Sequence, residues 1–451
     1  MELFGTAGIR GDVRTAVTPE LALAVGRAAG ADGGEFVLGR DGRTTGAGLA
    51  DAMAAGLTSA GADVVRVGQV PTPTVGFASR GRRGIVITAS HNPPTDNGIK
   101  LFVDGQEYDD ESEARIETRV DDDADPLAWD EWGATTEADL LPDYRAAVVD
   151  YAREYGEPLD DLEIAVDCGN GMASLATPQV LRELGGDVRA LNANVDGHFP
   201  GRESKPTAET LRDLRAFVAD GDAELGIGHD GDADRIVIVD ADGEVVHEDT
   251  VLAILAEHYV RASEAGDPVV VTTPNASGRI DERVEAAGGR VERVRLGALH
   301  VGIATARDEG TDETSVAFAA EPWKHIHTRF GGWIDGVASA AVFARLVAES
   351  GLDALRAPVT ERPYRKGDVR CPDEAKAAAM DLLGERLPGT FPDATVETEH
   401  GVRLSFSDGS WVLVRPSGTE PYLRVYVESD DVDAVLEAVT DVVDEAVETA
   451  R

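Results

Sequence analysis

The chain has 451 residues, too many for one compact core, and this length predicts three or four domains with clefts between them. Its 84 acidic and 42 basic residues give a formal net charge of −42, which would repel the phosphates of nucleic acid and of anionic membranes. An acidic coat of this size is typical of adaptation to high salt, so we expect a halophilic source. The absence of a secretory signal, the lack of membrane-spanning apolar runs and the presence of only two cysteines favour a cytoplasmic protein.

Strand-like and helix-like stretches alternate along the first 150 residues. Short β-branched runs predict strands at residues 36–39, 63–67 and 84–87. Helices are predicted from Pro19, with Thr18 as the N-cap, and around residues 46–60. Because strands and helices alternate, we expect a parallel, doubly wound α/β sheet.

A glycine-rich stretch at residues 5–11 contains Thr6 and Arg10. Glycines allow backbone amides and a guanidinium to approach an anion. An ordinary turn is an equally good interpretation of this stretch alone.

The loop Thr88-Ala89-Ser90-His91-Asn92-Pro93-Pro94 follows the predicted strand at residues 84–87. Its two prolines prevent simple helical continuation. Ser90 is therefore expected at the carboxyl end of a strand, where open α/β sheets bind ligands. The dipeptide Asn97-Gly98 then predicts a turn that would bring Lys100 back towards this loop, although a surface lysine on a hairpin is an open alternative.

Three carboxylates at alternate positions, Asp230, Asp232 and Asp234, follow an apolar strand-like run at residues 225–229. On a glycine-containing loop they can converge on one cation, and oxygen-only ligands suit Mg²⁺. Arg235 can balance charge there or hold a phosphate. A calcium-binding hand is excluded, because Arg235 and Ala241 replace its required glycine and glutamate. A phosphatase with Asp230 as nucleophile and a plain acidic surface loop remain alternatives.

Two later loops carry further polar groups. Glu321, Lys324 and His325, with the aromatic face of Trp323, follow a predicted strand at 315–319 and suit a sugar. From about residue 357 the pattern changes to a small α+β domain, with strands predicted at 396–402, 403–406, 410–415 and 422–427 and a helix from about 432 to 449.

One turn of this last region, residues 415–421, suits an anionic phosphate. It combines arginine, hydroxyl and glycine groups, namely Arg415, Ser417, Gly418 and Thr419, with Arg424 behind them. A proline-bracketed surface turn is the alternative.

In this order the loops resemble those of the α-D-phosphohexomutase family, which comprises phosphoglucomutases, phosphomannomutases and phosphoglucosamine mutases. The resemblance covers the whole chain. Residues 88–94 resemble the phosphoserine loop of that family, 230–235 its metal loop, 321–325 its sugar loop and 415–421 its phosphate-binding loop. The resemblance implies three related α/β/α doubly wound domains plus a small α+β C-terminal domain around a central cleft. We expect these domains at residues 1–152, 153–251, 252–356 and 357–451.

The resemblance also implies a reaction. Ser90 would carry a phosphoryl group whose oxygen joins Asp230, Asp232 and Asp234 around Mg²⁺, with a hexose 1,6-bisphosphate as intermediate and primer. Lys100, helped by His91 or Arg10, would serve as the acid/base group. Substrate contacts are implied for Thr6, Arg235, Glu321, His325, Arg415, Ser417, Gly418, Thr419 and Arg424.

The chain departs from the family pattern in the region that reads the sugar. Trp323 and Lys324 stand where the family usually has serine and glycine, and Ala298 replaces a polar or charged residue. We therefore expect interconversion of hexose 1- and 6-phosphates, with glucose or mannose ahead of glucosamine. A phosphorylated hexose is the expected partner, without nucleic acid or membrane, and the protein is expected to be a monomer or homodimer. The alternatives of another class are a phosphatase using Asp230 and a non-catalytic phosphosugar-binding homologue.

Overall fold

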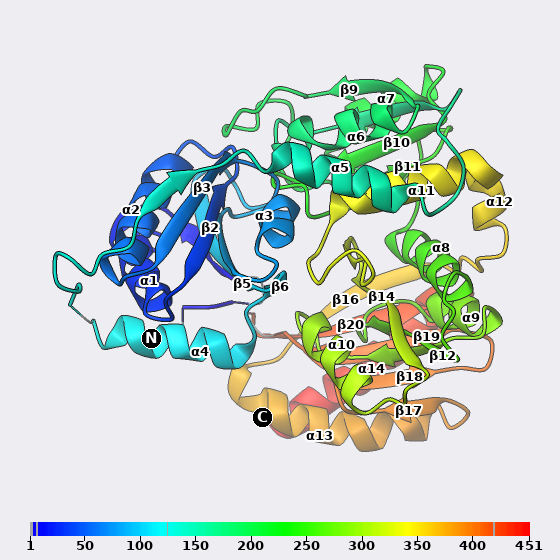
Figure 1. The fold of residues 1–451 in the computed structure, drawn as a ribbon. Coiled ribbons are helices and arrows are strands. Elements are labelled where there is room, and N and C mark those ends of the chain that lie inside the picture. Colours follow the sequence, from blue (N-terminus) through cyan, green and yellow to red (C-terminus); the bar gives the residue numbers. More distant parts are fainter. Residues whose placement is uncertain (1–2, 6–7, 124, 418–419) are drawn as a thin grey trace. The chain divides into compact units, whose positions relative to one another are not determined.

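The computed structural model describes residues 3–5, 8–123, 125–417 and 420–451 (Figure 1). The chain divides into two compact units. One unit comprises residues 1–248 and 323–355, and the other comprises residues 249–322 and 356–451. Across the described residues, no helix is both long and apolar enough to cross a bilayer.

The first unit begins with a seven-stranded sheet of order β1-β5-β4-β2-β3-β7, in which β6 pairs with β5. Its strands are β1 (Ile9–Asp12), β2 (Glu35–Arg40), β3 (Asp63–Gln69), β4 (Arg83–Ile87), β5 (Asp96–Val103), β6 (Gln106–Glu107) and β7 (Thr135–Glu137). Its helices are α1 (Pro19–Gly30), α2 (Gly46–Ser59), α3 (Thr72–Ala78) and α4 (Asp110–Asp121). Helices α1, α2 and α4 pack on one face, while α3 packs on the other (Figure 1). The expected doubly wound arrangement is confirmed here, and β4, β2, β3 and β7 are parallel as expected. Strands β1, β5 and β6 instead pair antiparallel.

Local sequence signals explain where several of these elements begin. The Thr18 hydroxyl accepts a hydrogen bond from the Leu21 N–H at 3.3 Å, and Pro19 occupies the first turn of α1. The turn predicted at Asn97-Gly98 is wrong, because both residues lie inside β5. The chain reverses earlier, where the Asp96 N–H donates to the Pro93 carbonyl at 3.0 Å.

The second sheet of this unit has order β11-β10-β8-β9, with β8, β9 and β10 parallel. Its strands are β8 (Glu163–Asp167), β9 (Asp187–Leu191), β10 (Leu225–His229) and β11 (Ile236–Val239). The associated helices are α5 (Leu141–Ala152), α6 (Thr177–Glu183), α7 (Arg212–Ala219) and α11 (Gly336–Ser350). The short strand β15 (Lys324–Ile326) also belongs to this unit, although it lies far along the chain.

The second unit contains a parallel sheet in which β13 (Arg290–Arg293), β12 (Asp267–Thr272) and β14 (Thr314–Glu321) are neighbours. Helices α8 (Glu248–Arg261), α9 (Gly278–Ala286) and α10 (Leu299–Asp308) accompany this sheet, and α12 (Leu352–Arg356) precedes the last domain. The protein thus contains three α/β/α domains followed by a C-terminal α+β domain, as the sequence led us to expect.

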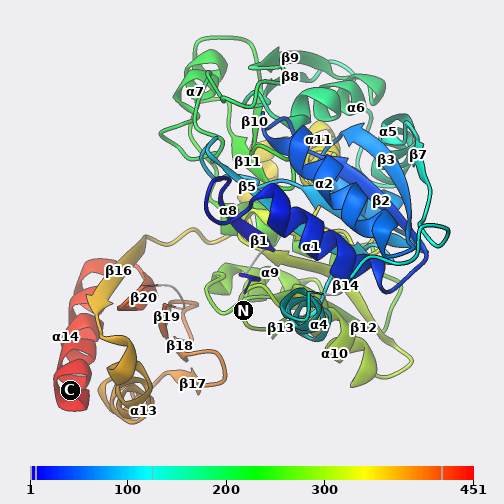
Figure 2. The ribbon, with the colours of Figure 1, turned by 90° about the vertical axis from the view of Figure 1, so that its left-hand side faces the viewer.

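The C-terminal sheet is antiparallel, with order β16-β20-β19-β18-β17. Its strands are β16 (Tyr364–Arg370), β17 (Thr395–Glu397), β18 (Val402–Ser405), β19 (Trp411–Pro416) and β20 (Tyr422–Glu428). Helices α13 (Asp373–Thr390) and α14 (Val432–Ala450) share one apolar core against it (Figure 2). The predicted strand at 396–402 is wrong in extent, since β17 ends at Glu397 and a turn precedes β18. Helix α13 and strand β16 were not anticipated.

Candidate active site

Ser90 lies in the loop that follows β4, at the carboxyl end of that strand as expected. Its side chain is buried and its backbone has a left-handed φ of 49°. The Ser90 N–H donates to the Thr88 hydroxyl at 2.9 Å, and that hydroxyl donates to Asp41 at 2.7 Å. These contacts hold the serine in a backbone region that non-glycine residues seldom adopt.

Arg43 organises the same loop from the turn that follows β2. Its Nε donates to the Asp41 carboxylate at 3.1 Å, and both groups are buried. Its two terminal nitrogens donate to four backbone carbonyls of the serine loop, those of Ser90, Asn92, Pro93 and Asp96, at 2.6–2.9 Å. All five N–H groups of the guanidinium are therefore used, four of them on the backbone at residues 90–96 and the fifth on Asp41.

Asp230, Asp232 and Asp234 lie on the loop between β10 and β11, and all three are buried. One carboxylate oxygen from each lies within 4.8 Å of the others. Each carboxylate also accepts a hydrogen bond from the first domain. The donors are the Ser90 hydroxyl to Asp230 at 2.7 Å, the Thr72 hydroxyl to Asp232 at 2.6 Å and the Lys100 ammonium to Asp234 at 2.8 Å. The predicted serine, lysine and carboxylates thus form one site.

The donor set of this site suits a hard divalent cation such as Mg²⁺. Three carboxylates from one short loop converge, and oxygen ligands are those that Mg²⁺ prefers. Asp232 Oδ1 and Asp234 Oδ1 are buried, yet neither accepts a hydrogen bond from any described residue. Buried carboxylate oxygens without such partners are stabilised by a bound cation.

The charges of the site differ from those of the isolated side chains. Burial and the charges of Asp234 and Asp232 raise the pKa of Asp230 well above its usual range. Burial alone would lower the pKa of Lys100, but the carboxylates of Asp234 and Glu107 outweigh it and raise that pKa. Burial and the neighbouring charges of Arg235 and Arg10 lower the pKa of His91 to about 3. Lys100 is therefore protonated at neutral pH, whereas His91 is neutral.

The other predicted residues of this region lie around the serine and the carboxylates. His91 Nδ1 lies 3.3 Å from Ser90 Oγ. Arg235 Nε lies 3.8 Å from Asp230 and 3.7 Å from Asp234. Arg10 lies on β1, opposite Gly98 of β5. Thr6 lies outside the described residues.

The predicted sugar residues fall in different units. In the second unit, Glu321 ends β14 and accepts a hydrogen bond from the Gly297 N–H at 2.6 Å. The buried Ala298 follows that glycine and precedes α10. Ala298, which departs from the family pattern, is therefore next to the residue whose N–H binds the predicted sugar residue Glu321.

In the first unit, His325 is 2 % exposed, and Lys324 forms a backbone bridge with Arg235. Trp323 has a left-handed φ of 75° and packs against the apolar cluster of the second sheet, which includes Val237 and Val239. The bulky Trp323 side chain of the sugar loop is thus packed against the domain that carries the three aspartates.

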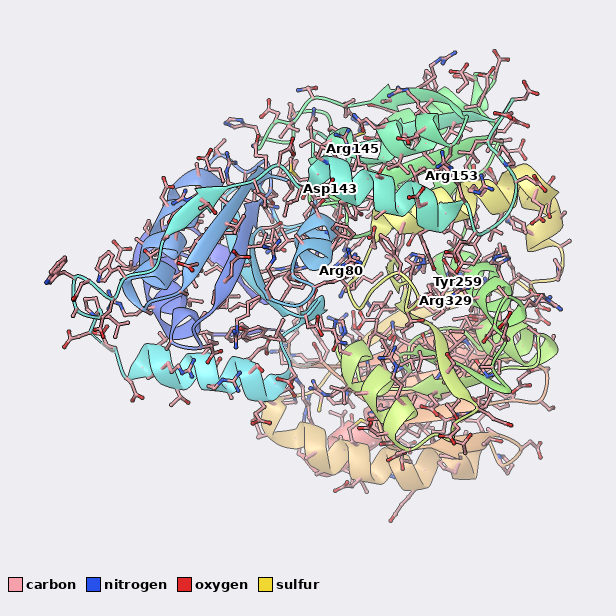
Figure 3. All side chains as sticks on the ribbon, viewed as in Figure 1. Arg80, Asp143, Arg145, Arg153, Tyr259 and Arg329 are labelled. Atoms are coloured by element: carbon pink, nitrogen blue, oxygen red, sulfur yellow. The ribbon has the colours of Figure 1, made fainter. Side chains whose placement is uncertain are left out.

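Arg329 ties the loop that follows β15 to the segment after α5. Arg329, labelled in Figure 3, donates to Glu154 at 3.1 Å and to the Tyr155 hydroxyl at 3.4 Å. Phe330 stacks on Tyr151 of α5, with ring centroids 4.9 Å apart. The loop between β15 and α11 is therefore supported by both polar and aromatic contacts.

The predicted phosphate loop follows β19. Arg415 and Arg424 are opposite each other on β19 and β20, where Arg415 donates to the Tyr426 hydroxyl at 3.0 Å and Arg424 to Glu420 at 2.5 Å. Ser417 is buried. Gly418 and Thr419 lie outside the described residues. Two arginines on adjacent strands support the interpretation as an anion site.

Several residues that shape the site were not anticipated from the sequence. Asp41 and Arg43 follow β2, the neighbour of β4, so polar groups at the ends of adjacent parallel strands were the available signal. Thr72 begins α3 after a proline and gave no comparable signal. Lys376 of α13 donates to the backbone carbonyls of Ser417 and Glu420 at 2.6 and 2.7 Å, and it was missed because α13 was missed.

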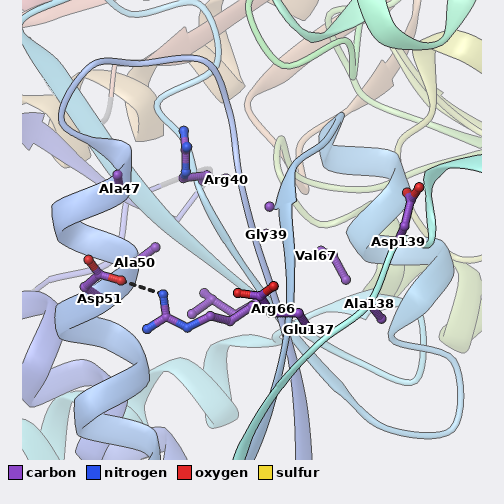
Figure 4. A pocket seen from close by; sticks show the side chains of 12 residues that line it. Gly39, Arg40, Ala47, Ala50, Asp51, Arg66, Val67, Glu137, Ala138 and Asp139 are labelled. Carbon is purple, nitrogen blue, oxygen red and sulfur yellow. Dashed lines mark hydrogen bonds and ion pairs between the residues drawn. The ribbon is translucent and has the colours of Figure 1, made fainter.

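A cavity of about 530 Å³ opens elsewhere on the first domain (Figure 4). It lies beside the carboxyl-terminal halves of β2 and β3, where Arg66 and Asp51 form an ion pair of 2.5 Å. Neither Ser90 nor any of the three aspartates lines it. This cavity is separate from the serine–carboxylate site.

Comparison with known families accounts for nearly the whole chain. Residues 1–126, 143–243 and 247–362 match the phosphoglucomutase/phosphomannomutase α/β/α domains I, II and III, and residues 368–445 match the C-terminal domain of the same family. A phosphopentomutase of Thermococcus kodakarensis is 41 % identical over 437 residues, covering 95 % of this chain and 94 % of the relative. A probable phosphoglucosamine mutase of Methanopyrus kandleri is 43 % identical over 455 residues, covering 98 % and 97 %.

Solved structures show the same fold. A phosphoglucomutase/phosphomannomutase family protein of Burkholderia thailandensis superposes with a TM-score of 0.85 at 26 % identity, covering 99 % of this chain and 97 % of that one. The N-acetylphosphoglucosamine mutase of Aspergillus fumigatus, solved with GlcNAc-6P and magnesium, gives a TM-score of 0.61 at 17 % identity, covering 100 % and 96 %. With its four matched domains and near-full-length relatives, the chain belongs to the phosphoglucomutase/phosphomannomutase family, whose members are mutases and hence isomerases.

Proposed function

We propose that this protein transfers a phosphoryl group between C1 and C6 of a hexose phosphate by way of phosphorylated Ser90. The observation that carries the proposal is the hydrogen bond of 2.7 Å between the Ser90 hydroxyl and Asp230, inside a buried group of three carboxylates. A serine in this position can exchange a phosphoryl group beside a bound divalent cation. The positive charge of the cation would offset the negative charge of the phosphoryl oxygens.

The residues of the site have distinct roles in the proposed reaction. Asp230, Asp232 and Asp234 hold the cation, and Arg43 keeps the serine loop in its strained conformation. Lys100 is protonated and buried beside Asp234, so it can donate a proton to the oxygen that loses the phosphoryl group. The neutral amine that results can then take the proton of the hydroxyl that accepts the phosphoryl group. His91, whose pKa is lowered by burial and by the charges of Arg235 and Arg10, would assist as a proton acceptor.

Other predicted residues would bind the substrate. Arg10 and Arg235 supply positive charge beside the site, while Glu321 and His325 would recognise sugar hydroxyls. The phosphate that does not react would be held by the loop of Arg415, Ser417, Gly418 and Thr419, with Arg424. Thr6 remains a proposed phosphate contact.

Glucosamine phosphate is the first candidate substrate, because seven relatives, at 36–43 % identity, are described as probable phosphoglucosamine mutases. A second candidate is a pentose phosphate, favoured by the phosphopentomutase relative. Glucose and mannose phosphates, preferred from the sequence alone, stay in the set of substrates to be tested.

A substrate panel tests the proposal. The full-length protein, with Mg²⁺ and the matching sugar bisphosphate as primer, is incubated in high salt with the 1-phosphates of glucosamine, glucose, mannose and ribose. We expect at least one hexose 1-phosphate to yield its 6-phosphate, whereas turnover of ribose 1-phosphate alone, to its 5-phosphate, would favour the pentose candidate. Failure with all four would contradict the proposal, provided that the protein is folded by circular dichroism.

The position of the covalent phosphate separates this reaction from the alternatives. Intact mass and peptide mapping should place one phosphoryl group on Ser90. A phosphoryl group on Asp230 would instead indicate a phosphatase. Sugar phosphate binding without turnover or phosphoprotein would indicate a non-catalytic binding protein.

A further inference from the structure

Ser339 connects two buried histidines in the first unit. Its hydroxyl oxygen lies 3.1 Å from His325 Nδ1, 2.8 Å from His327 Nε2 and 2.7 Å from the Asp335 carbonyl oxygen. His325, His327 and Ser339 are 2 %, 1 % and 0 % exposed. One hydroxyl therefore contacts three hydrogen-bonding atoms in a site with little access to water.

The proton of Ser339 can be assigned from these distances. A carbonyl oxygen only accepts hydrogen bonds, so two oxygens 2.7 Å apart need the serine proton between them. The serine oxygen then retains two acceptor positions, and each histidine must fill one of them with an N–H. His325 is consequently protonated at Nδ1 and His327 at Nε2.

Both rings are neutral in this environment. Burial lowers the pKa of His325 and of His327 to about 3. A neutral imidazole carries one proton, so protonation at one nitrogen leaves the other as an acceptor. The two histidines hence adopt opposite tautomers although they share one partner.

We infer that Ser339 is a positioning residue that holds His325 in the Nδ1–H tautomer and so makes its Nε2 a hydrogen-bond acceptor for a sugar hydroxyl. The tautomer follows from the contacts of Ser339 alone. Its role in sugar recognition rests on the proposed function, in which His325 belongs to the sugar loop.

The frame around Ser339 is rigid, which the inference requires. Asp335 is the N-cap of α11, and its carboxylate accepts from the Ala338 N–H, the Tyr144 hydroxyl and the Trp333 indole N–H, each at 2.8 Å. Because Ser339 donates to the carbonyl of the same residue, its hydroxyl is held in one direction.

Nuclear magnetic resonance of the full-length protein with ¹⁵N-labelled histidine tests the tautomers directly. The signals of His325 and His327 are assigned from their absence in the variants His325→Gln and His327→Gln. We expect a protonated Nδ1 and an unprotonated Nε2 for His325, with the opposite pattern for His327. A proton on Nε2 of His325 would overturn the inference.

Substitution of Ser339 tests its part in the arrangement. Ser339→Ala should remove the Nδ1–H preference of His325 and raise KM for the sugar phosphate roughly 3- to 10-fold, the effect of one lost hydrogen bond, with a smaller change in kcat. Ser339→Thr retains the hydroxyl and should restore the wild-type tautomer. The control is Ser59→Ala, which deletes another buried helical hydroxyl, bonded to the Gly56 carbonyl at 2.8 Å, and should change neither quantity. An unchanged His325 tautomer in Ser339→Ala would show that the serine is not responsible.

Addition of the sugar phosphate that gives turnover completes the test. Saturation should shift the Nε2 signal of His325, and an unmoved signal would overturn the role in substrate binding. If the wild-type protein turned over no sugar phosphate, the proposed function would fail while the tautomer assignment stood, so the two failures are distinguishable.

Discussion

At Ser90 the backbone adopts a left-handed conformation that is unfavourable for a serine by about 1 kcal/mol. Replacement by alanine or glycine removes the hydroxyl, so we expect no phosphoprotein by intact mass and no mutase turnover from either variant. Ser90→Gly should nevertheless be more stable than Ser90→Ala by about 1 kcal/mol, because glycine tolerates positive φ. Denaturant unfolding measures the difference. Equal stabilities would argue against strain at this residue, and retained turnover would refute the phosphate-carrier role.

Arg43 offers a second test, because four of its N–H groups hold the backbone at residues 90–96 and the fifth holds Asp41. Lysine keeps the charge but has three donors and no planar fork. We expect Arg43→Lys to lower the free energy of unfolding by about 2–4 kcal/mol and turnover at least about 100-fold. The control is Arg66→Lys, whose ion pair with the exposed Asp51 should contribute less than about 1 kcal/mol (Figure 4). Similar losses in both variants would contradict the proposed role of Arg43.

The buried His327 makes the free energy of unfolding depend on pH. Burial lowers its pKa to about 3, whereas an unfolded chain has a histidine pKa of about 6.5. Between pH 6.5 and pH 3 the unfolded chain binds a proton at this histidine and the folded protein does not. The contribution of His327 to stability is therefore fully present above pH 6.5 and is lost as the pH falls towards 3. The loss is at most about 1.4 kcal/mol per pH unit for one histidine. His327→Gln should therefore give a shallower decline in the free energy of unfolding between pH 7 and 4, and parallel curves would exclude this effect.

Helix α13 supports the phosphate loop through one side chain. Lys376 donates to the carbonyls of Ser417 and Glu420, so the loop conformation depends on a helix distant in sequence. We expect Lys376→Met to raise KM for the sugar phosphate roughly tenfold, as two hydrogen bonds are lost. Phosphorylation of Ser90 by excess bisphosphate should still occur. Arg365→Gln removes an equal charge from β16, where Arg365 pairs with Asp433, and should leave KM unchanged. An equal rise in KM for Arg365→Gln would show that the loss of positive charge, and not the loss of the two hydrogen bonds, weakens substrate binding.

The whole molecule carries a net charge of −42, which no single ion pair can offset. Between 0.1 M and 1 M salt the screening length falls from about 10 Å to about 3 Å, so repulsion among the acidic side chains should weaken. We expect the thermal unfolding midpoint to rise by at least about 5 °C over this range of KCl, equivalent to a few kcal/mol. Sucrose at equal osmolality serves as the uncharged control. A midpoint that is independent of KCl would contradict salt adaptation.

The amino-acid sequence by itself determined the kinds of domain and most of the reactive groups. Short apolar runs predicted the strands before Ser90 and Asp230, since a buried strand and its terminal loop differ strongly in composition. The order of four polar loops was enough for the resemblance to one family. Helix α13 was missed because its lysine, glycines and proline give no clear apolar stripe.

The tertiary structure alone decided which groups meet. Ser90, Thr72 and Lys100 reach Asp230, Asp232 and Asp234 across 140, 160 and 134 residues, and pairing over such distances depends on the packing of two sheets. The same holds for Ser339, whose single proton sets the tautomers of two histidines. Local sequence determines what a loop can offer, whereas the direction of each hydrogen bond is set by neighbours brought in by the fold.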